Sequence, residues 1–251
     1  MVSLSYPTRL LLSVMAYVAA YVLASNVAWA LRKPLSGRPG QVLASARLWG
    51  RRLWLADLAR TAYYLLGPYW VLREGWASPL DLGLADLDWI RGVGIAVALG
   101  VSSAILLWWL WRQYARHIEP RLPMPQALRA GQPWGWAFAL REAILLESGW
   151  ALMRSPFLLL AGPYFGVYAG LSVALLAGLL KTRTRYELGV YGLAEGIILT
   201  AQLAVVTATL YVFTHNLWLC IALHLSLRLL VLRLVGDDTR AVPMADRQRS
   251  A

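Results

Sequence analysis

The chain has 251 residues, of which 59% are hydrophobic and only 15% are charged, and it carries 13 Trp and 12 Tyr. Soluble domains contain about 25% charged residues, so this composition excludes an ordinary soluble fold and predicts an integral membrane protein. The net charge of +11 does not indicate a nucleic-acid partner, because the basic residues lie between hydrophobic runs, where the positive-inside rule accounts for them. The single cysteine, Cys220, lies within an apolar run, which excludes a disulfide framework and a cysteine-based zinc site.

The predicted fold is all-α, a polytopic transmembrane helical bundle of about seven spans. A spanning helix needs about 20 mainly apolar residues. Runs of this kind are Thr8–Leu31, Leu53–Leu72, Gly92–Trp111, Trp134–Met153, Pro156–Leu180, Val190–Phe213 and Asn216–Val235. Asp57 and Arg60 interrupt the second run, although their i, i+3 spacing lets them neutralise each other on one helix face. This run is predicted to span, and the alternative is a helix lying in the membrane interface.

The distribution of basic residues predicts the orientation. With seven spans, most Lys and Arg residues fall on one side, in the loops 32–52, 112–129 and 181–185 and in the tail, whereas the other side holds Arg9, Arg73, Arg91 and Arg154. The positive-inside rule then places the N-terminus outside and the C-terminus in the cytoplasm. If the second run does not span, the N-terminus moves inside and the last five spans keep their direction. The predicted organisation is N-terminal spans and basic loops at 1–130, a core at 131–235 and a polar tail at 236–251.

Four ionisable side chains lie inside the later spans at matching predicted depths. Counted from the outer ends of their spans, with the earlier one ending before Arg154, Glu147 and His224 lie about 10 to 12 Å deep, and Glu142 and Arg228 lie about 18 Å deep. Ionisable groups at membrane depth are costly and by default mark a functional site. If the two helices are neighbours, the four side chains form two layers of complementary groups.

A carboxylate and an imidazole at one level are suited to general acid and base catalysis, because together they can take a proton from water and return it to a leaving amine. The simpler alternative is that Glu147 and His224 hydrogen-bond to each other, or to Ser148 and Ser226, and fix helix packing. A catalytic zinc needs three protein ligands. Only Glu142, Glu147 and His224 would be available, which is a poor set, so no metal or other cofactor is predicted.

Two further predictions concern packing. Glu195 is expected to lie shallowly in its span and to extend toward the basic residues of loop 181–185. The alternative is that it faces Gln202 or the polar layer of the other helices. Gly162, Gly166 and Gly170 are spaced by four and are expected to form a face on which another helix approaches closely.

Three short motifs resemble the CPBP family of intramembrane proteases, the CAAX-processing and bacteriocin-processing group. Residues 214–224, Thr-His-Asn-Leu-Trp-Leu-Cys-Ile-Ala-Leu-His, resemble that family's third motif, in which a short turn and Leu-Trp lead into a helix carrying His-x-x-x-Asn. Residues 146–151, Leu-Glu-Ser-Gly-Trp-Ala, resemble its first motif, Glu-Glu-x-x-x-Arg. Residues 82–84, Leu-Gly-Leu, are similar to the lead-in to an earlier span. The resemblance covers residues 80–235 and implies a CPBP-like four-helix core at 134–235.

The sequence departs from the family pattern at several positions. Leu146 stands where the first glutamate is expected, Ala151 stands at the arginine position, and Arg228 replaces the asparagine of the third motif. The second motif, Phe-x-x-x-His, has no counterpart, because the only histidine between residues 118 and 223 is His215, at the turn before the last span.

The resemblance implies a hydrolytic site in which glutamates and two histidines activate water and the asparagine stabilises the oxyanion. Here only Glu147 and His224 remain. Arg228 could offer donors to an oxyanion or neutralise Glu142 in a buried ion pair, and the matching depths favour the ion pair.

Three function classes follow from these residues. The first is a CPBP-like protein of the bacterial cytoplasmic membrane that has lost or reduced peptidase activity. It would act by binding a membrane protein or a prenylated or leader peptide within the lipid bilayer. The second is an active glutamate-dependent intramembrane endopeptidase, and the third is an unrelated membrane scaffold or transporter.

Overall fold

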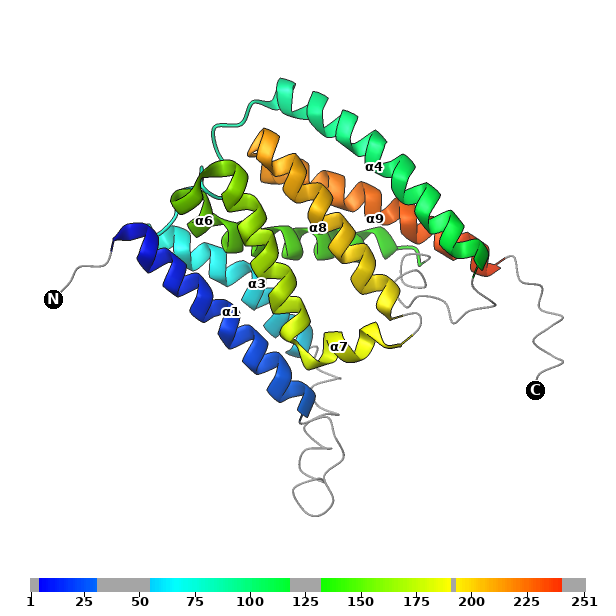
Figure 1. Ribbon diagram of the computed structural model, residues 1–251, viewed down its shortest axis with the longest axis horizontal. Helices are drawn as coiled ribbons and strands as arrows, with labels where there is room; N and C mark the ends of the chain where they lie inside the picture. Colours follow the sequence, from blue (N-terminus) through cyan, green and yellow to red (C-terminus); the bar gives the residue numbers. More distant parts are fainter. Residues whose placement is uncertain (1–4, 31–54, 118–131, 191–192, 241–251) are drawn as a thin grey trace, which may run out of the picture. The chain divides into compact units, whose positions relative to one another are not determined.

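The computed structural model describes residues 5–30, 55–117, 132–190 and 193–240. Within these ranges the chain forms helices and no strand, which confirms the predicted all-α fold. The helices are α1 (Tyr6–Ala30), α3 (Leu55–Arg73), α4 (Trp89–His117), α6 (Gly135–Leu180), α7 (Thr182–Leu188), α8 (Ala194–Thr214) and α9 (Leu217–Arg240), labelled in Figure 1.

Five of these helices are long and apolar enough to cross a membrane: α1, α4, α6, α8 and α9. Many of their large apolar side chains are exposed, as expected for surfaces that face lipid. The chain is therefore a multi-pass integral membrane protein. Most of the predicted span Leu53–Leu72 falls in α3, a helix of 19 residues with Asp57 in its first turn and Pro68 inside it, and residues 53 and 54 lie outside the described ranges. α3 is not among the five helices.

The predicted break between two spans at Arg154 is wrong. α6 continues as a helix of 46 residues through this position, and its non-helical residue is Gly162, with φ 75° and ψ 175°. This backbone region is open essentially only to glycine. Pro163 follows, and proline suits the first position of a helix because it lacks the N–H that would have no partner there. Gly162 therefore divides α6 into a first arm, residues 135–161, and a second arm, residues 163–180.

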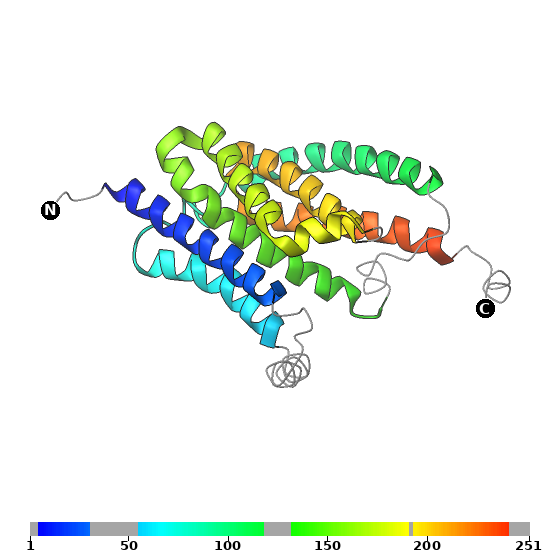
Figure 2. The same cartoon turned by 60° about the horizontal axis from the view of Figure 1, so that its bottom comes forward.

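The two arms of α6 fold back on each other around Gly162, as the reversal of this helix in Figures 1 and 2 shows. A Cβ atom on Gly170 would lie 2.4 Å from Cα of Arg154, and one on Gly166 would lie 2.5 Å from the carbonyl oxygen of Phe157. These two contacts lie symmetrically about the bend, so the arms run antiparallel. The predicted close-approach face is confirmed for Gly166 and Gly170, whereas Gly162 forms the bend itself.

The chain divides into two compact units and passes between them at three points, after residues 82, 147 and 186. The second of these boundaries falls inside the first arm of α6. The first unit contains α1, α3 and the part of α6 that follows the boundary. In it α1 packs antiparallel on α3: Tyr17 stacks on Tyr63 with ring centroids 4.0 Å apart, and Tyr21 contacts both Tyr63 and Tyr64. Asn26 then joins the end of α1 to the end of α6, because its side-chain amide donates to the carbonyl oxygen of Leu180.

The second unit contains α4, α8, α9 and residues 135–147 of α6. α4, α8 and α9 contact one another pairwise. Trp111 on α4 donates its indole N–H to the side-chain oxygen of Gln202 on α8 at 3.1 Å. In a membrane the hydrophobic effect does not hold helices together, so close packing and interhelical hydrogen bonds of this kind take its place.

Candidate functional site

The start of α9 is fixed by a short turn that closes α8. His215 adopts a left-handed conformation with φ 47° and caps α8, because its backbone N–H donates to the carbonyl oxygen of Tyr211 at 2.8 Å. Asn216 begins the next helix, since its side-chain oxygen accepts the backbone N–H of Leu219 at 3.1 Å, the usual N-cap interaction. His224 follows about two turns into α9, so the turn determines where its side chain points.

The loop before α4 packs against this turn. Gly83 has φ 73°, and a Cβ atom there would lie 2.6 Å from the ring of Tyr211 and 2.7 Å from the carbonyl oxygen of His215. The carbonyl oxygen of Gly83 accepts the backbone N–H of Leu217 at 2.9 Å. A glycine is therefore required at position 83, and the loop before α4 holds the first turn of α9.

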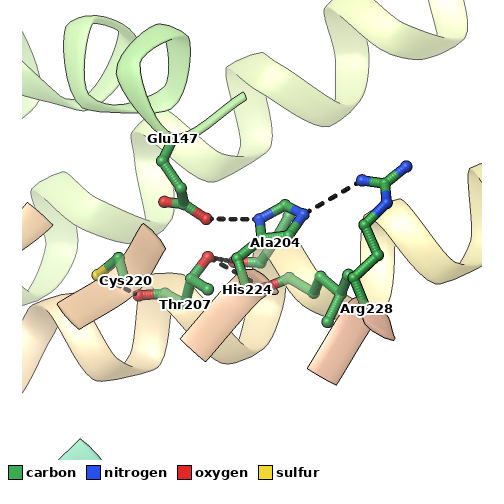
Figure 3. A network of polar contacts seen from close by, with 7 residues as sticks. Glu147, Ala204, Thr207, Cys220, His224 and Arg228 are labelled. Carbon is green, nitrogen blue, oxygen red and sulfur yellow. Dashed lines mark hydrogen bonds and ion pairs between the residues drawn. The ribbon is translucent and has the colours of Figure 1, made fainter. Parts of the chain in front are cut away.

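The structure brings Glu147 and His224 together inside the second unit (Figure 3). Nδ1 of His224 lies 2.9 Å from Oε1 of Glu147, and both side chains are 0% exposed. The predicted meeting of these two groups is thus observed. The alternative pairing with Ser226 is not observed, because the hydroxyl of Ser226 donates to the carbonyl oxygen of Ala222 in its own helix.

Arg228 engages the other nitrogen of the same imidazole. Its Nη1 lies 3.3 Å from Nε2 of His224 (Figure 3), and the side chain is 4% exposed. The two residues lie at i and i+4 on α9, where side chains share a helix face. A guanidinium has no acceptor atom, so Nε2 must accept this hydrogen bond. The ring proton of a neutral imidazole then resides on Nδ1, which donates to Oε1 of Glu147.

The site is therefore a chain of three groups, in which a neutral imidazole connects a carboxylate to a guanidinium. A carboxylate and a guanidinium in one buried cluster balance each other's charge, which lowers the cost of holding either in an apolar environment. The sequence placed Arg228 with Glu142 rather than with His224. The i, i+4 spacing of His224 and Arg228 was the signal for the observed contact, while the predicted ion pair with Glu142 stays a prediction.

The depths counted from Arg154 are wrong, because the first arm of α6 does not end there. It continues for about two more turns to residue 161, so Glu147 lies near the middle of the arm. Arg154 is itself 3% exposed and packed against Gly170. Glu147 and His224 meet even though their distances from the helix ends differ. Two side chains can therefore reach each other although they lie at different numbers of residues from the ends of their helices.

One atom of the site lacks a partner. Among the described residues, Oε2 of Glu147 has no hydrogen-bond donor, although the side chain is fully buried. A buried acceptor without a donor costs about 1 to 3 kcal/mol, and more when it is charged. This oxygen is therefore the atom of the site that offers an acceptor to a group not supplied by the described chain.

The neighbouring polar groups satisfy one another. The hydroxyl of Thr207 donates to the carbonyl oxygen of Leu203 at 3.0 Å, and the thiol of Cys220 lies 3.4 Å from the carbonyl oxygen of Thr207 (Figure 3). Cys220 is 0% exposed, so its thiol is packed inside the second unit. The three-ligand metal set of Glu142, Glu147 and His224 does not form, since no group of three such side chains able to hold a metal is found across residues the structure describes.

Glu195 lies in the first turn of α8, which agrees with its predicted shallow position in the span. It is 4% exposed and accepts a hydrogen bond from the hydroxyl of Tyr114 at 2.8 Å. The expectation that it would extend toward loop 181–185 is wrong, because a tyrosine on α4 supplies a donor that the sequence pattern of α8 alone does not reveal.

Comparison with known proteins adds no family to these observations. No family model, no curated protein and no solved structure matches the chain. The resemblance of residues 80–235 to CPBP proteases therefore stays a prediction from short motifs. Two features do not depend on this resemblance. The chain is a multi-pass helical membrane protein, and its second unit holds the buried contacts of Glu147, His224 and Arg228.

Proposed function

We propose that this protein is a CPBP-like membrane protein with lost or reduced peptidase activity, and that it binds a membrane protein or peptide at Glu147. The observation that carries this proposal is that both ring nitrogens of His224 are engaged inside the protein, one by Glu147 and the other by Arg228.

The engaged nitrogens argue against hydrolysis in this conformation. A general base must take a proton from water through a free lone pair within hydrogen-bond reach. In His224 the Nδ1 position carries the proton given to Glu147, and the lone pair of Nε2 accepts from Arg228. The same contact uses one N–H of Nη1 of Arg228 on the imidazole. Water activation by His224 would first require Arg228 to leave.

The unpartnered oxygen of Glu147 supports a binding role. Buried polar groups are almost always paired, and a bound donor would supply what Oε2 lacks. Inside a bilayer the backbone N–H groups of an unwound peptide face the same problem, since lipid offers them no acceptor. A peptide that brings one N–H, amine or guanidinium to Glu147 would satisfy both partners at once. A prenylated peptide or a leader peptide has this chemistry.

A second candidate is an active glutamate-dependent intramembrane endopeptidase. The same unpartnered oxygen favours it, because a carboxylate oxygen without a donor could hold and deprotonate the hydrolytic water. This candidate requires Glu147 itself to act as the base while His224 orients it.

A turnover assay separates the two candidates. The purified wild-type protein, Glu147→Gln and His224→Ala are incubated in proteoliposomes with prenylated peptides and with leader-type peptides, and the products are measured by mass spectrometry. We expect the wild type to release no more product than either variant. Cleavage by the wild type that both substitutions abolish would overturn the proposal and establish the second candidate.

A binding measurement tests the other half of the proposal. The same peptides, labelled with a fluorophore, are titrated with wild type, Glu147→Gln and a control, Glu74→Gln, which alters an exposed carboxylate on another segment. A hydrogen bond to a charged group contributes about 1.5 to 3 kcal/mol, so Glu147→Gln should weaken binding about 10-fold to 100-fold. Equal affinity of all three proteins, or no binding by the wild type, would contradict a peptide role for Glu147.

A further inference from the structure

The first unit contains an apolar cavity of about 160 Å³ that is distinct from the Glu147 site. Its lining includes Val14 and Tyr17 from α1, Gly67 and Trp70 from α3, and Leu152 from the first arm of α6. Trp70 is 53% exposed, so the cavity reaches the outer surface of the unit. An opening lined by apolar side chains in a membrane protein is suited to hydrocarbon.

A cluster of tyrosines joins α1 and α3 beside this cavity. The hydroxyl of Tyr17 donates to the carbonyl oxygen of Tyr63, and the hydroxyl of Tyr63 donates back to the carbonyl oxygen of Tyr17 at 3.0 Å. The hydroxyls of Tyr21 and Tyr64 lie 3.4 Å apart. The polar ends of these rings are thus used within the protein, and the ring of Tyr63 stacks on those of Tyr17 and Tyr21.

Two cations lie over the faces of this cluster. Nζ of Lys181 lies 5.1 Å from the ring centre of Tyr21, and Cζ of Arg60 lies 5.7 Å from the ring centre of Tyr64. The two rings contact each other edge to face, so both cations flank one small aromatic surface. The acidic residues nearest in the sequence are Asp57, one turn before Arg60 on α3, and Glu187, six residues after Lys181. Each of the two rings thus has one positive group over it.

The cavity and the cations follow the same faces of α1 and α3. On α1, Val14 and Tyr21 are about two turns apart, and on α3, Arg60 and Gly67 are about two turns apart, so each pair shares one face of its helix. Two turns correspond to about 10 Å. The acyl chains of one leaflet extend over about half of the ~30 Å hydrocarbon core, or about 15 Å. One lipid can therefore reach from the cations to the cavity.

We infer that the first unit binds one anionic phospholipid, with its phosphate against Arg60 and Lys181 and one acyl chain in the cavity. Lys181 begins the segment that also contains Arg183 and Arg185, and basic clusters at one membrane face attract anionic lipids, which are enriched in the cytoplasmic leaflet. This inference concerns the first unit alone and does not depend on the proposed peptide site.

Native mass spectrometry of the full chain tests the phosphate contact, with phosphatidylglycerol and phosphatidylcholine titrated separately. The wild type should retain one phosphatidylglycerol in preference to phosphatidylcholine. Arg60→Gln and Lys181→Gln should each weaken phosphatidylglycerol binding about fivefold, since one basic residue near a membrane surface contributes about 1 kcal/mol. Arg73→Gln, which removes an exposed cation at the other end of α3, should leave it unchanged. Equal retention of both lipids, or a loss of the same size in Arg73→Gln, would overturn the assignment.

A cavity-filling variant tests the acyl chain. Ser13→Leu, which places a larger side chain in the cavity wall, should weaken binding of phosphatidylglycerol at least fivefold, whereas Ser172→Leu on the exposed face of the second arm should not. Inorganic phosphate should fail to displace the lipid; displacement at equal concentration would indicate a free-anion site and overturn the lipid assignment. If Arg60→Gln loses its helical circular dichroism, Lys181→Gln and Arg60→Lys decide the result, because the first should lower and the second should retain binding.

Discussion

Replacement of His224 by asparagine should destabilise the protein far more than the loss of an ordinary interhelical hydrogen bond. Such bonds inside membranes contribute about 0.6 kcal/mol on average and at most about 1.7 kcal/mol. His224, however, is the only observed donor to Glu147, because Oε2 has no donor among the described residues. Asparagine is too short to span from Glu147 to Arg228. The carboxylate would keep its burial and lose its connection to the guanidinium, and an uncompensated buried charge costs about 3 to 5 kcal/mol. We therefore expect a loss of about 3 kcal/mol.

The free energy of unfolding in mild detergent, measured by denaturant titration, checks this value. His215→Asn is a matched control, since asparagine tolerates the left-handed backbone of that exposed position, and it should change stability by less than about 0.5 kcal/mol. The double variant Glu147→Gln, His224→Asn should lose less stability than the sum of the two single variants, because it has no buried carboxylate that could be left without a partner. A loss below 1 kcal/mol for His224→Asn, with additive single effects, would refute the charged network.

Three other substitutions, one of them with a matched control, test separate parts of the structure by the same measurement. Gly162→Ala should cost about 1 to 3 kcal/mol of stability, because the positive φ and extended ψ of this residue exclude a side chain. Its control, Gly178→Ala, should stabilise the second arm by about 0.5 to 1 kcal/mol, because a Cβ atom there meets nothing within 4 Å. Equal effects of the two substitutions would contradict a bend at Gly162. Asn216→Ala should cost about 1 kcal/mol through loss of the N-cap of α9, and a neutral result would argue against that cap. Tyr114→Phe should cost about 1 to 3 kcal/mol by removing the donor to buried Glu195, and an unchanged stability would show that water replaces the hydroxyl.

Hydropathy alone predicted most of the helices, because a membrane allows a spanning chain few other structures. It failed in the middle of α6. Arg154 suggested a loop, since a cation inside an apolar run usually marks a boundary, yet the structure buries this arginine against Gly170. The true bend is at Gly162, where Gly-Pro within an apolar run was the local signal. Choosing between the two positions requires knowing that the arms pack antiparallel, which is a tertiary property.

The sequence also predicted the meeting of Glu147 and His224, although 77 residues separate them, because two costly ionisable groups within apolar helices have few ways to be stabilised other than each other. It did not predict the partner of Arg228. The matching predicted depths of Glu142 and Arg228 favoured an ion pair between them, while the i, i+4 spacing on α9 favoured a contact of Arg228 with His224. The sequence alone does not choose between these two rules, because the choice depends on the directions of the side chains. The tautomer of His224 depends on that choice, and so does the argument against base catalysis.

The unpartnered oxygen of Glu147 decides between a structural and a functional reading of the site. A polar network that serves only to hold helices together gains most when every member is satisfied, because a partly satisfied network in a medium of low dielectric is worse than an apolar contact. Here His224 has both nitrogens engaged while Glu147 has one oxygen without a donor among the described residues. Packing explains the imidazole completely and the carboxylate only in part. The cost of the second oxygen is most simply offset by a ligand that brings a donor, and for this reason we assign the binding role to Glu147 and the positioning role to His224 and Arg228.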